Sequence, residues 1–530
     1  MPTITATVVM QCELAGAGGG WTDISADTRI GVQAIEVQYG IGGSGPLDRI
    51  AETGTMSWAM DNSTGNSGGV QGYYSPGHTN ARANWDLGIA IRLKITYGGT
   101  DYYKFRGTLI DVQPDAGQYQ RQAVVCSAVD WMDEAARSKI KGIAIQEGQR
   151  SDQLVSNIVT NSVTRQPSAT DYETGQSTFA FALDNLLDGQ TSVLRALADV
   201  TISELGYLYV KGDTTQGGTL KFEDRHGRAR FGSAAGSFDN SMVTLDVTRS
   251  RTDLINRVYV VVHPRTVAGS ESVLYELTTT ESVPSVSAGE TIKITALFKA
   301  RTAAGDEMDY RIAGKTITTP ASGTDWIANS AEDGSGSNLT ASVNVTLSVT
   351  AANAVEFSIE NTAAVTAYLT TLQVRGYAVT DVSETVISAD DSTSQTAYGE
   401  IDARVDMKYE SNTGEFTNNL AAWLLNTYKD PRYVVKQLSL AANTSSTLMT
   451  QALAREPGDK ITLAEEMTGI VETVGTGEVG YFINGVQFRV GGGGVIRASW
   501  TLSPGEAQAF WILQTVGASE LGLTTRLGFA

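Results

Sequence analysis

The chain has 530 residues, a formal net charge of −19 at pH 7, and charged residues at 18% of its positions. This length corresponds to about three to five domains. The negative charge excludes a general nucleic-acid binder, because such a protein needs a basic surface that displaces counterions from phosphates.

The composition favours strands over helical bundles. Glycine is abundant at 55 residues, proline is sparse at 11, and Thr, Val, Ser and Ala are common. β-Branched and aromatic residues are enriched in strands. The two cysteines, Cys12 and Cys126, are too few for a disulfide framework, and no Cys/His cluster predicts zinc. We therefore expect a mainly β, multidomain protein of β-rich α+β class with no cofactor.

The sequence gives no sign of secretion or membrane insertion. Residues 1–14 lack the basic start and the apolar run of a signal peptide. No run of about 18 apolar residues occurs anywhere in the sequence. We therefore expect no membrane-spanning segment, and a protein that stays in the cytoplasm where it is made.

Residues 1–140 are predicted to form a β-barrel domain. Apolar and polar residues alternate over 89–97, and this period of two predicts a half-buried strand. The return strand changes its apolar phase after Gly107, which predicts a β-bulge that curves the sheet. Residues 61–84 are rich in Gly, Ser and Asn and are predicted to form a long, contact-making loop.

Residues 141–250 are predicted to form an α+β domain. Ser151 is placed to cap a helix with one apolar face. A second helix is expected to begin at Thr191 or Ser192 and to end near Gly206, a favourable C-cap residue. A hairpin should follow, with strands at 207–210 and 219–223.

Residues 266–377 are predicted to be an inserted antiparallel β-sandwich. Their composition differs from the flanking sequence, being rich in Thr, Ala and Ser and poor in helical patterns. Alternating runs at 292–298 and 355–359 predict strands of such a sandwich. The insertion is expected to project outward from the rest of the protein.

Residues 251–265 and 378–530 are predicted to form a second barrel with a mixed C-terminal region. The strand 257–262 needs a partner, and the best candidates lie at 384–388 or 403–409. Such pairing would bring the two ends of the insertion together, as inserted domains require. A helix around Trp423 should stop at Pro431.

The chain carries no motif of an enzyme. Its three histidines, His78, His226 and His263, are scattered and form no metal-binding pair. We find neither a nucleophile elbow nor a P-loop. Glycosidases need two carboxylates across a sugar, and without a motif an acidic sequence does not identify such a pair. We expect no catalytic residues.

Three aromatic residues of the insertion, Tyr310, Trp326 and Tyr368, are candidates for stacking on a sugar ring. The alternative is that they fill the core of the sandwich. The segment 332–338 superficially resembles a calcium loop, but it lacks the spacing and the downstream Glu of an EF-hand. Both questions stay open at this stage.

Four passages occur in an order that is shared with one protein family. They are 21–24 with 54–62, 204–210 with 220–225, 398–400 with the helix around Trp423, Tyr428, 431–432 and 458–459, and 511–527. In this order they resemble the hub proteins at the tail tips of long-tailed bacteriophages, which are relatives of the trimeric baseplate hubs of contractile tails. The resemblance touches most of the chain outside 266–377.

The resemblance implies a structural virion protein without enzyme activity. Three chains would form a ring that closes the tail tube, and two similar barrels in each chain would present a pseudo-six-fold face to the hexameric tube. The implied partners are copies of the chain, distal tail or tail tube proteins, the tape-measure protein and tail fibres, with DNA only in transit. The implied location is the tail tip of the virion, after assembly in the host cytoplasm.

The insertion resembles carbohydrate-binding modules of phage proteins and glycosidases, through the stretches 286–291 and 368–376. An alternative function is therefore a tail protein that binds a host-surface glycan or receptor through residues 266–377. A third hypothesis is a cell-wall hydrolase, which no motif supports.

Overall fold

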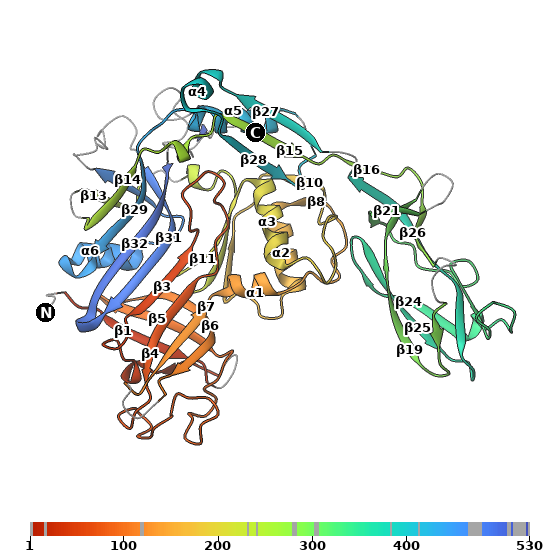
Figure 1. Ribbon diagram of the computed structural model, residues 1–530, viewed down its shortest axis with the longest axis horizontal. Helices are drawn as coiled ribbons and strands as arrows, with labels where there is room; N and C mark the ends of the chain where they lie inside the picture. Colours follow the sequence, from red (N-terminus) through yellow and green to blue (C-terminus); the bar gives the residue numbers. More distant parts are fainter. Residues whose placement is uncertain are drawn as a thin grey trace.

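The computed structural model describes residues 4–14, 19–116, 121–230, 233–239, 242–277, 283–301, 307–381, 384–411, 414–464, 480–505, 510–511 and 526–527. Strands make up 44% of the protein and helices 17%, which confirms the mainly β, multidomain fold. Figure 1 shows a large sheet at one side of the molecule, helices beside it, and the insertion at the other side. The expected ending at 511–527 lies outside the described residues, except for parts of β33 (Phe510–Trp511) and β34 (Arg526–Leu527).

One 13-stranded sheet combines strands from both ends of the chain. Its order is β14–β29–β32–β31–β3–β4–β7–β6–β5–β1–β2, with β30 attached to β31 and β13 to β30. The strands are β1 (Thr7–Cys12), β2 (Thr22–Asp23), β3 (Ile35–Gly40), β4 (Thr55–Asp61), β5 (Ala90–Tyr97), β6 (Thr100–Pro114), β7 (Ala123–Val129), β13 (Gly236–Asp239), β14 (Thr244–Thr248), β29 (Val434–Ala441), β30 (Lys460–Ala464), β31 (Gly480–Gly491) and β32 (Val495–Pro504). Antiparallel pairing of β3 with β31 joins the two ends. Strands from the two regions in which barrels were expected therefore share one sheet and one hydrophobic core.

Two irregularities in β6 flank Gly107. The register shifts at Lys104 where β6 pairs with β5, and at Ile110 where it pairs with β7. The β-bulge expected in this strand is therefore present, but at Lys104 and Ile110 and not at Gly107 itself. Glycine is required there for another reason, because a Cβ would lie 2.1 Å from the carbonyl oxygen of Val129. The bulges leave Ile110 42% exposed and Lys104 1% exposed.

The ammonium group of Lys104 connects three regions of the chain. Its partners are the carbonyl oxygens of Leu453 (3.1 Å) and Arg455 (3.0 Å), at the end of α6 (Ser446–Ala454), and the carboxylate of Glu456. Glu456 also accepts hydrogen bonds from the hydroxyl of Tyr39 (2.7 Å) and the amide of Gly212 (2.9 Å). Burial raises the pKa of Glu456, and Lys104 acts against that shift. The N-terminal strands, the α+β region and the C-terminal region therefore meet at one ion pair.

The α+β region packs its helices against a small sheet and has its own hydrophobic core. Its elements are α1 (Trp131–Arg137), α2 (Ser151–Ser162), α3 (Val193–Glu204), β8 (Gln146–Arg150), β9 (Ala169–Tyr172), β10 (Thr178–Ala182), β11 (Tyr207–Lys211) and β12 (Thr219–Glu223). The expected hairpin is confirmed as β11 and β12. Ser192 caps α3 by accepting a hydrogen bond from the amide of Arg195, as expected.

One expected helix start is wrong by one residue, whereas the helix end expected near Gly206 is confirmed. Ser151 is the first residue of α2, behind Arg150 at the N-cap, and its hydroxyl donates to the buried carboxylate of Glu204 (2.8 Å). Helix α3 ends on Leu205, which adopts the left-handed conformation at φ 61°. Gly206 is needed for close packing instead, because a Cβ there would lie 2.4 Å from a backbone oxygen of the opposite strand.

A third sheet confirms both expected partners of the strand 257–262. Here β15 (Arg257–Val262) lies between β27 (Thr385–Asp390), antiparallel to it, and β28 (Asp402–Met407), parallel to it. One face of this sheet packs on α5 (Glu415–Tyr428) in a separate core. The short helix α4 (Ser392–Tyr398) connects β27 with β28.

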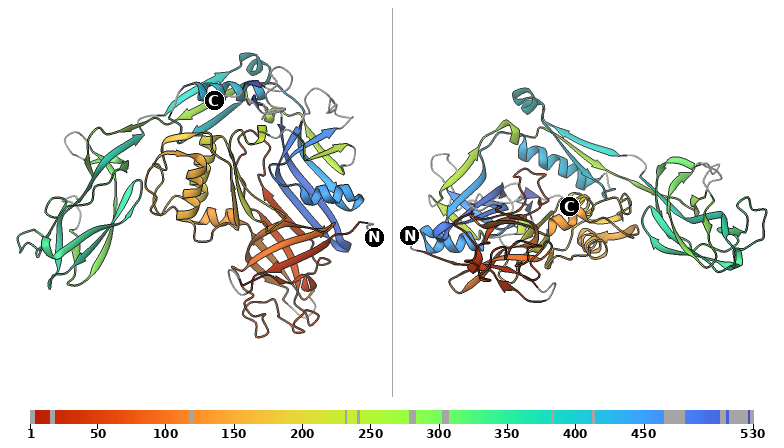
Figure 2. Two further views of the ribbon diagram at one scale, coloured as in Figure 1. Left: turned by 180° about the vertical axis from the view of Figure 1, so that it is seen from behind. Right: turned by 60° about the horizontal axis from the view of Figure 1, so that its bottom comes forward.

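The insertion has a hydrophobic core of its own between Leu274 and Ala378. Its strands are β16 (Arg265–Val267), β17 (Ser272–Glu276), β18 (Ser285–Val286), β19 (Thr291–Leu297), β20 (Lys299–Arg301), β21 (Glu307–Arg311), β22 (Ala313–Lys315), β23 (Trp326–Asn329), β24 (Val343–Thr350), β25 (Ala354–Asn361) and β26 (Ala367–Asp381). Arg265 lies opposite Asp381 where β16 pairs with β26, so the chain leaves and re-enters the core side by side. Both views of Figure 2 show the insertion at one end of the molecule. The domain boundaries given above stay a prediction.

Replacing residues 268–376 with a short Gly/Ser linker should leave the remaining chain folded. The ends that the linker must join are adjacent, since the retained residues Val267 and Val379 are cross-strand partners in β16 and β26. A shorter loop also costs less closure entropy. We expect a soluble protein whose melting temperature is close to that of the parent. An insoluble product would mean that the insertion is part of the scaffold.

Substituting Lys104 with Met should lower the free energy of unfolding by about 3–5 kcal/mol, because it leaves the buried charge of Glu456 without its partner. The double variant Lys104→Met/Glu456→Gln should lose less than this single variant. Chemical denaturation measures both values. The control is Lys94→Met, which removes a more exposed pair with Asp101 (3.0 Å) and should cost about 1 kcal/mol or less. Equal losses at Lys104 and Lys94 would contradict the prediction.

Candidate functional sites: a polar sheet face and a charged junction

A row of uncharged polar side chains crosses six strands of the large sheet. In cross-strand order, it consists of Thr244, Ser439, Ser499, Gln487, Gln38 and Thr55. All of them are exposed or half-buried, and the hydroxyls of Ser439 and Ser499 share a hydrogen bond of 2.7 Å. Adjacent residues of the same strands point into the core, because side chains alternate along a strand. The row, which we call the polar row, crosses the β3–β31 pairing and so belongs to both ends of the chain.

The neighbouring row carries the charges of this face. Arg497 lies opposite Arg489, and Arg489 lies opposite Glu36. Glu36 and Arg489 form an ion pair of 3.1 Å. The two facing arginines form an arrangement that charge repulsion disfavours. With part of the polar row, these residues line a shallow hollow of about 440 Å³.

This face can make many weak polar contacts and few strong ones. Half of the residues that line the hollow carry amides or hydroxyls, and its charged residues are two arginines and one glutamate. Affinity for phosphates comes mainly from cations, so a nearly neutral wall neither holds nor repels a polyanion strongly. Stable protein interfaces need a more apolar centre. The face therefore suits transient contact with a hydrated, charged polymer.

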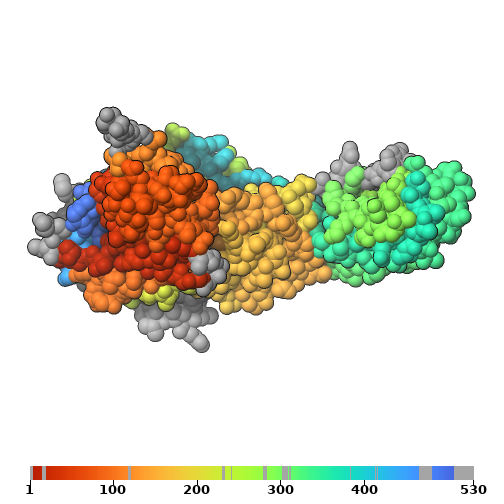
Figure 3. All heavy atoms as spheres, turned by 90° about the horizontal axis from the view of Figure 1, so that it is seen from below, coloured from red at the N-terminus to blue at the C-terminus, as the bar shows by residue number. Residues whose placement is uncertain are grey.

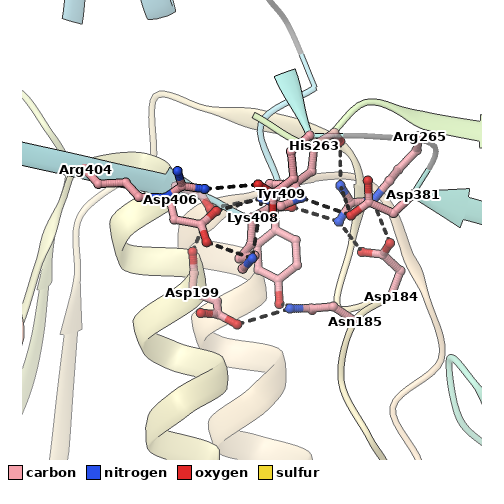
Figure 4. Close-up of polar contacts among 12 residues, drawn as sticks. Asp184, Asn185, Asp199, His263, Arg265, Asp381, Arg404, Asp406, Lys408 and Tyr409 are labelled. Carbon is pink, nitrogen blue, oxygen red and sulfur yellow. Dashed lines mark hydrogen bonds and ion pairs between the residues drawn. The ribbon is translucent and has the colours of Figure 1, made fainter. Parts of the chain in front are cut away.

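A charged junction forms where the insertion leaves the core (Figure 4). The ring of His263 lies between two carboxylates, with Nδ1 3.0 Å from Asp381 and Nε2 2.6 Å from Asp406. Asp381 ends β26 of the insertion, whereas Asp406 lies in β28 of the core. Both ring nitrogens thus lie within hydrogen-bonding distance of a carboxylate, one on each side of the junction. His263 thereby ties the insertion to the core.

Arg265 makes a second tie at this junction. Its guanidinium binds both carboxylate oxygens of Asp184, at 2.6 and 3.1 Å, and their side chains are 4% and 6% exposed. It also donates to the carbonyl of Lys408 (2.8 Å). Although burial acts to raise the pKa of Asp406, hydrogen bonds from Lys408 and His263 hold it below its ordinary value. The bidentate pairing of Arg265 with Asp184 fixes the orientation of the guanidinium as well as its distance from the carboxylate.

Sequence reasoning missed the role of His263. Its two partners are 118 and 143 residues away, so no local motif connects them. The one available signal was the position of His263 and Arg265 directly after the strand 257–262, where the insertion begins. His226 lies in a turn after β12, as expected, with its amide bound to the carboxylate of Asp224 (2.6 Å).

The structure does not bring the three candidate sugar-binding residues onto one face. Trp326 is 5% exposed and belongs to the core of the insertion. Tyr368 is half-buried, and strand alternation places it on the opposite face of the sheet from Trp326. Tyr310 lies in β21. The burial of Trp326 favours the packing interpretation for that residue, while sugar binding by the insertion stays a prediction.

The loop 332–338 is closed by its own hydrogen bonds. The carboxylate of Asp333 accepts from the amide of Ser335 (2.9 Å), and the side chain of Asn329 donates to the carbonyl of Gly334 (3.0 Å). Among the described residues, no three His, Cys, Asp or Glu side chains are grouped to hold a metal ion.

In the part of the chain that the structure describes, no helix is both long and apolar enough to cross a membrane.

No protein-family model and no curated protein matches the sequence. Among solved structures, the chain is similar to the 43 kDa tail protein of prophage MuSo2 from Shewanella oneidensis, with 10% identity, a TM-score of 0.44, and coverage of 94% of this chain and 97% of that one. It is also similar to a tail protein from Neisseria meningitidis MC58, with 7% identity, a TM-score of 0.45, and coverage of 94% and 96%.

A third similar structure is the c3393 protein of E. coli, a component of the type VI secretion system described as similar to the T4 tail proteins gp27 and gp5. It shows 9% identity, a TM-score of 0.35, and coverage of 93% of this chain and 76% of that one. All three TM-scores lie below 0.5, so these likenesses alone assign no function.

Proposed function

We propose that the chain is a structural hub subunit of a bacteriophage tail tip or baseplate. The observation that carries this proposal is the pairing of β3 with β31, which joins two ends of the chain into one sheet. In this proposal the N-terminal strands and the C-terminal strands of each chain each face one subunit of the tube, so that three chains face six subunits. A closed ring of three identical chains would thus meet a hexameric tube with matching symmetry.

In such a ring, we assign the polar row to the wall of the central channel. This assignment is supported by the near-neutral composition of the face, in a chain whose net charge is −19. DNA and the tape-measure protein must slide past the wall, and strong cationic sites would hold the phosphates. Strong acidic sites would repel them. Amides and hydroxyls avoid both effects.

The proposed role is assembly and not catalysis. The ring would close the tail tube, anchor tail fibres and other tail-tip proteins, and pass DNA only in transit. Its place would be the tail tip of the virion, after assembly in the host cytoplasm. The large shared sheet supports this role, because it offers an extended rigid framework on which other subunits can dock.

Three copies per ring should be present in an assembled tail tip. Native mass measurement or imaging of tail tips tests this number directly. The physical reason is that each chain would face two subunits of the hexameric tube, so three chains are needed to face all six. A ring of five or six copies would refute the proposal, whereas a monomer before assembly is compatible with it.

Lysines on the polar row should slow DNA release without preventing assembly. In the variant Gln38→Lys/Gln487→Lys/Ser499→Lys, new cations would contact passing phosphates, so release should slow several-fold at low salt and less at high salt. Release is measured with a DNA-binding dye on triggered particles.

The matched control places one lysine at Thr295, which is exposed on β19 of the insertion. Its particles should release DNA at the rate of the parent. If the triple variant assembles and also releases DNA at the parental rate, the row does not face the channel.

A further inference from the structure

The insertion touches the rest of the protein at a second place, away from its junction. The ammonium of Lys315 lies 2.7 Å from the carboxylate of Glu147 and 5.4 Å from the ring centre of Phe181. The amide of Ala352 donates to the carbonyl of Ile143 at 2.9 Å. Figure 3 shows the insertion against the α+β region on this side of the molecule. We call this contact the latch.

Strand β26 connects the junction with the core of the insertion. It runs without interruption over 15 residues, from Ala367 to Asp381. Leu369, Leu372 and Val374 of this strand are buried in the core of the insertion, and Asp381 binds His263 at the junction. Along its length it pairs with β18, β23, β17, β22 and β16. The register with β23 shifts at Thr370, whereas every residue from Leu372 to Asp381 has a cross-strand partner, so this part of β26 joins the core of the insertion to the junction as a stiff element.

The two attachments differ in how easily they separate. At the junction, the Arg265–Asp184 pair is bidentate and almost fully buried. At the latch, the side chains of Lys315 and Glu147 are 24% and 46% exposed. An exposed ion pair is weak and is screened by salt, whereas breaking a buried one leaves an uncompensated charge. The Lys315–Glu147 pair of the latch therefore separates more easily than the Arg265–Asp184 pair of the junction.

We propose that the insertion is a lever that pivots at the His263 junction and is held closed by the latch. When the latch opens, the insertion tilts as one body. The displacement of Asp381 then acts through His263 on Asp406, and so on β28 and the sheet β27–β15–β28. A load on the insertion is thereby passed to the core of the protein. This inference does not depend on the copy number or the channel wall proposed above.

Hydrogen exchange of the purified full chain tests the latch, because the amide of Ala352 bonds across it. In Lys315→Glu, exchange of peptides spanning 351–353 should rise by about fivefold, the upper end for loss of an exposed ion pair. The charge swap Glu147→Lys/Lys315→Glu should restore parental exchange. The matched control is Lys293→Glu, which breaks an ion pair of 2.7 Å with Glu356 within the insertion and should leave 351–353 unchanged.

Two further readouts separate opening from unfolding. The amide of Leu369 bonds to Pro284 inside the insertion, and the amide of Ala268 bonds to Ala378 near the junction. Lys315→Glu should leave exchange at both unchanged. His263→Gln should raise exchange at Ala268 as well as at Ala352, because the single nitrogen of the Gln side chain cannot take the positions of both ring nitrogens.

The proposal is overturned if Lys315→Glu leaves 351–353 at the parental rate, or if the charge swap does not restore it. It is also overturned if exchange at Leu369 rises in parallel, since the insertion would then unfold and not tilt. If the amide of Ala268 exchanges at the same rate in His263→Gln as in the parent protein, the insertion does not pivot at His263.

Discussion

The arrangement of the whole molecule depends on the buried ammonium of Lys104, which needs charged and polar partners in the interior. The ammonium of Lys104 is removed from water, and its compensation comes from the end of α6 and from Glu456. Glu456 in turn binds Tyr39 and Gly212, so three regions must be present and correctly placed for every group to be satisfied. Buried ion pairs add little net stability compared with apolar packing. Because the partners of this ion pair come from three regions of the chain, the pair fixes how these regions lie relative to one another.

The same device recurs where the α+β region meets the C-terminal strands. The guanidinium of Arg228 is buried, pairs with Glu223 at 3.0 Å, and donates to the side chain of Asn484 in β31 at 2.7 Å. It also stacks 3.6 Å from the ring centre of Tyr207, and Arg49 lies over the same ring at 4.5 Å. Planar guanidinium groups suit such sites because they stack and donate at the same time. Strand β31 is thus held from one side by Arg228 and from the other by β3.

Local patterns in the sequence predicted local structure well. Periodicity gave the strand 257–262 and both of its partners, and cap and turn residues gave the β11–β12 hairpin. The β3–β31 pairing was beyond reach, because strands some 450 residues apart carry no mutual signal in one sequence. The inward position of Lys104 was equally hidden, since a bulge shifts the side-chain phase by one residue and alternation then predicts the wrong face. The role of His263 was missed because its partners, Asp381 and Asp406, are distant in sequence. The same distance lets His263 connect separate parts of the chain.

The buried charges and the uncharged face are two consequences of one constraint. A sheet shared by both ends of the chain can present a continuous polar row only if its register is fixed across the β3–β31 pairing, because a slip of one residue would turn core residues outward. Burial of one face of the sheet already opposes such a slip, and the directional hydrogen bonds of the buried ion pairs oppose it further. Charge held inside, at Lys104 and Arg228, therefore keeps the register under which Gln38, Gln487 and Ser499 come into line outside.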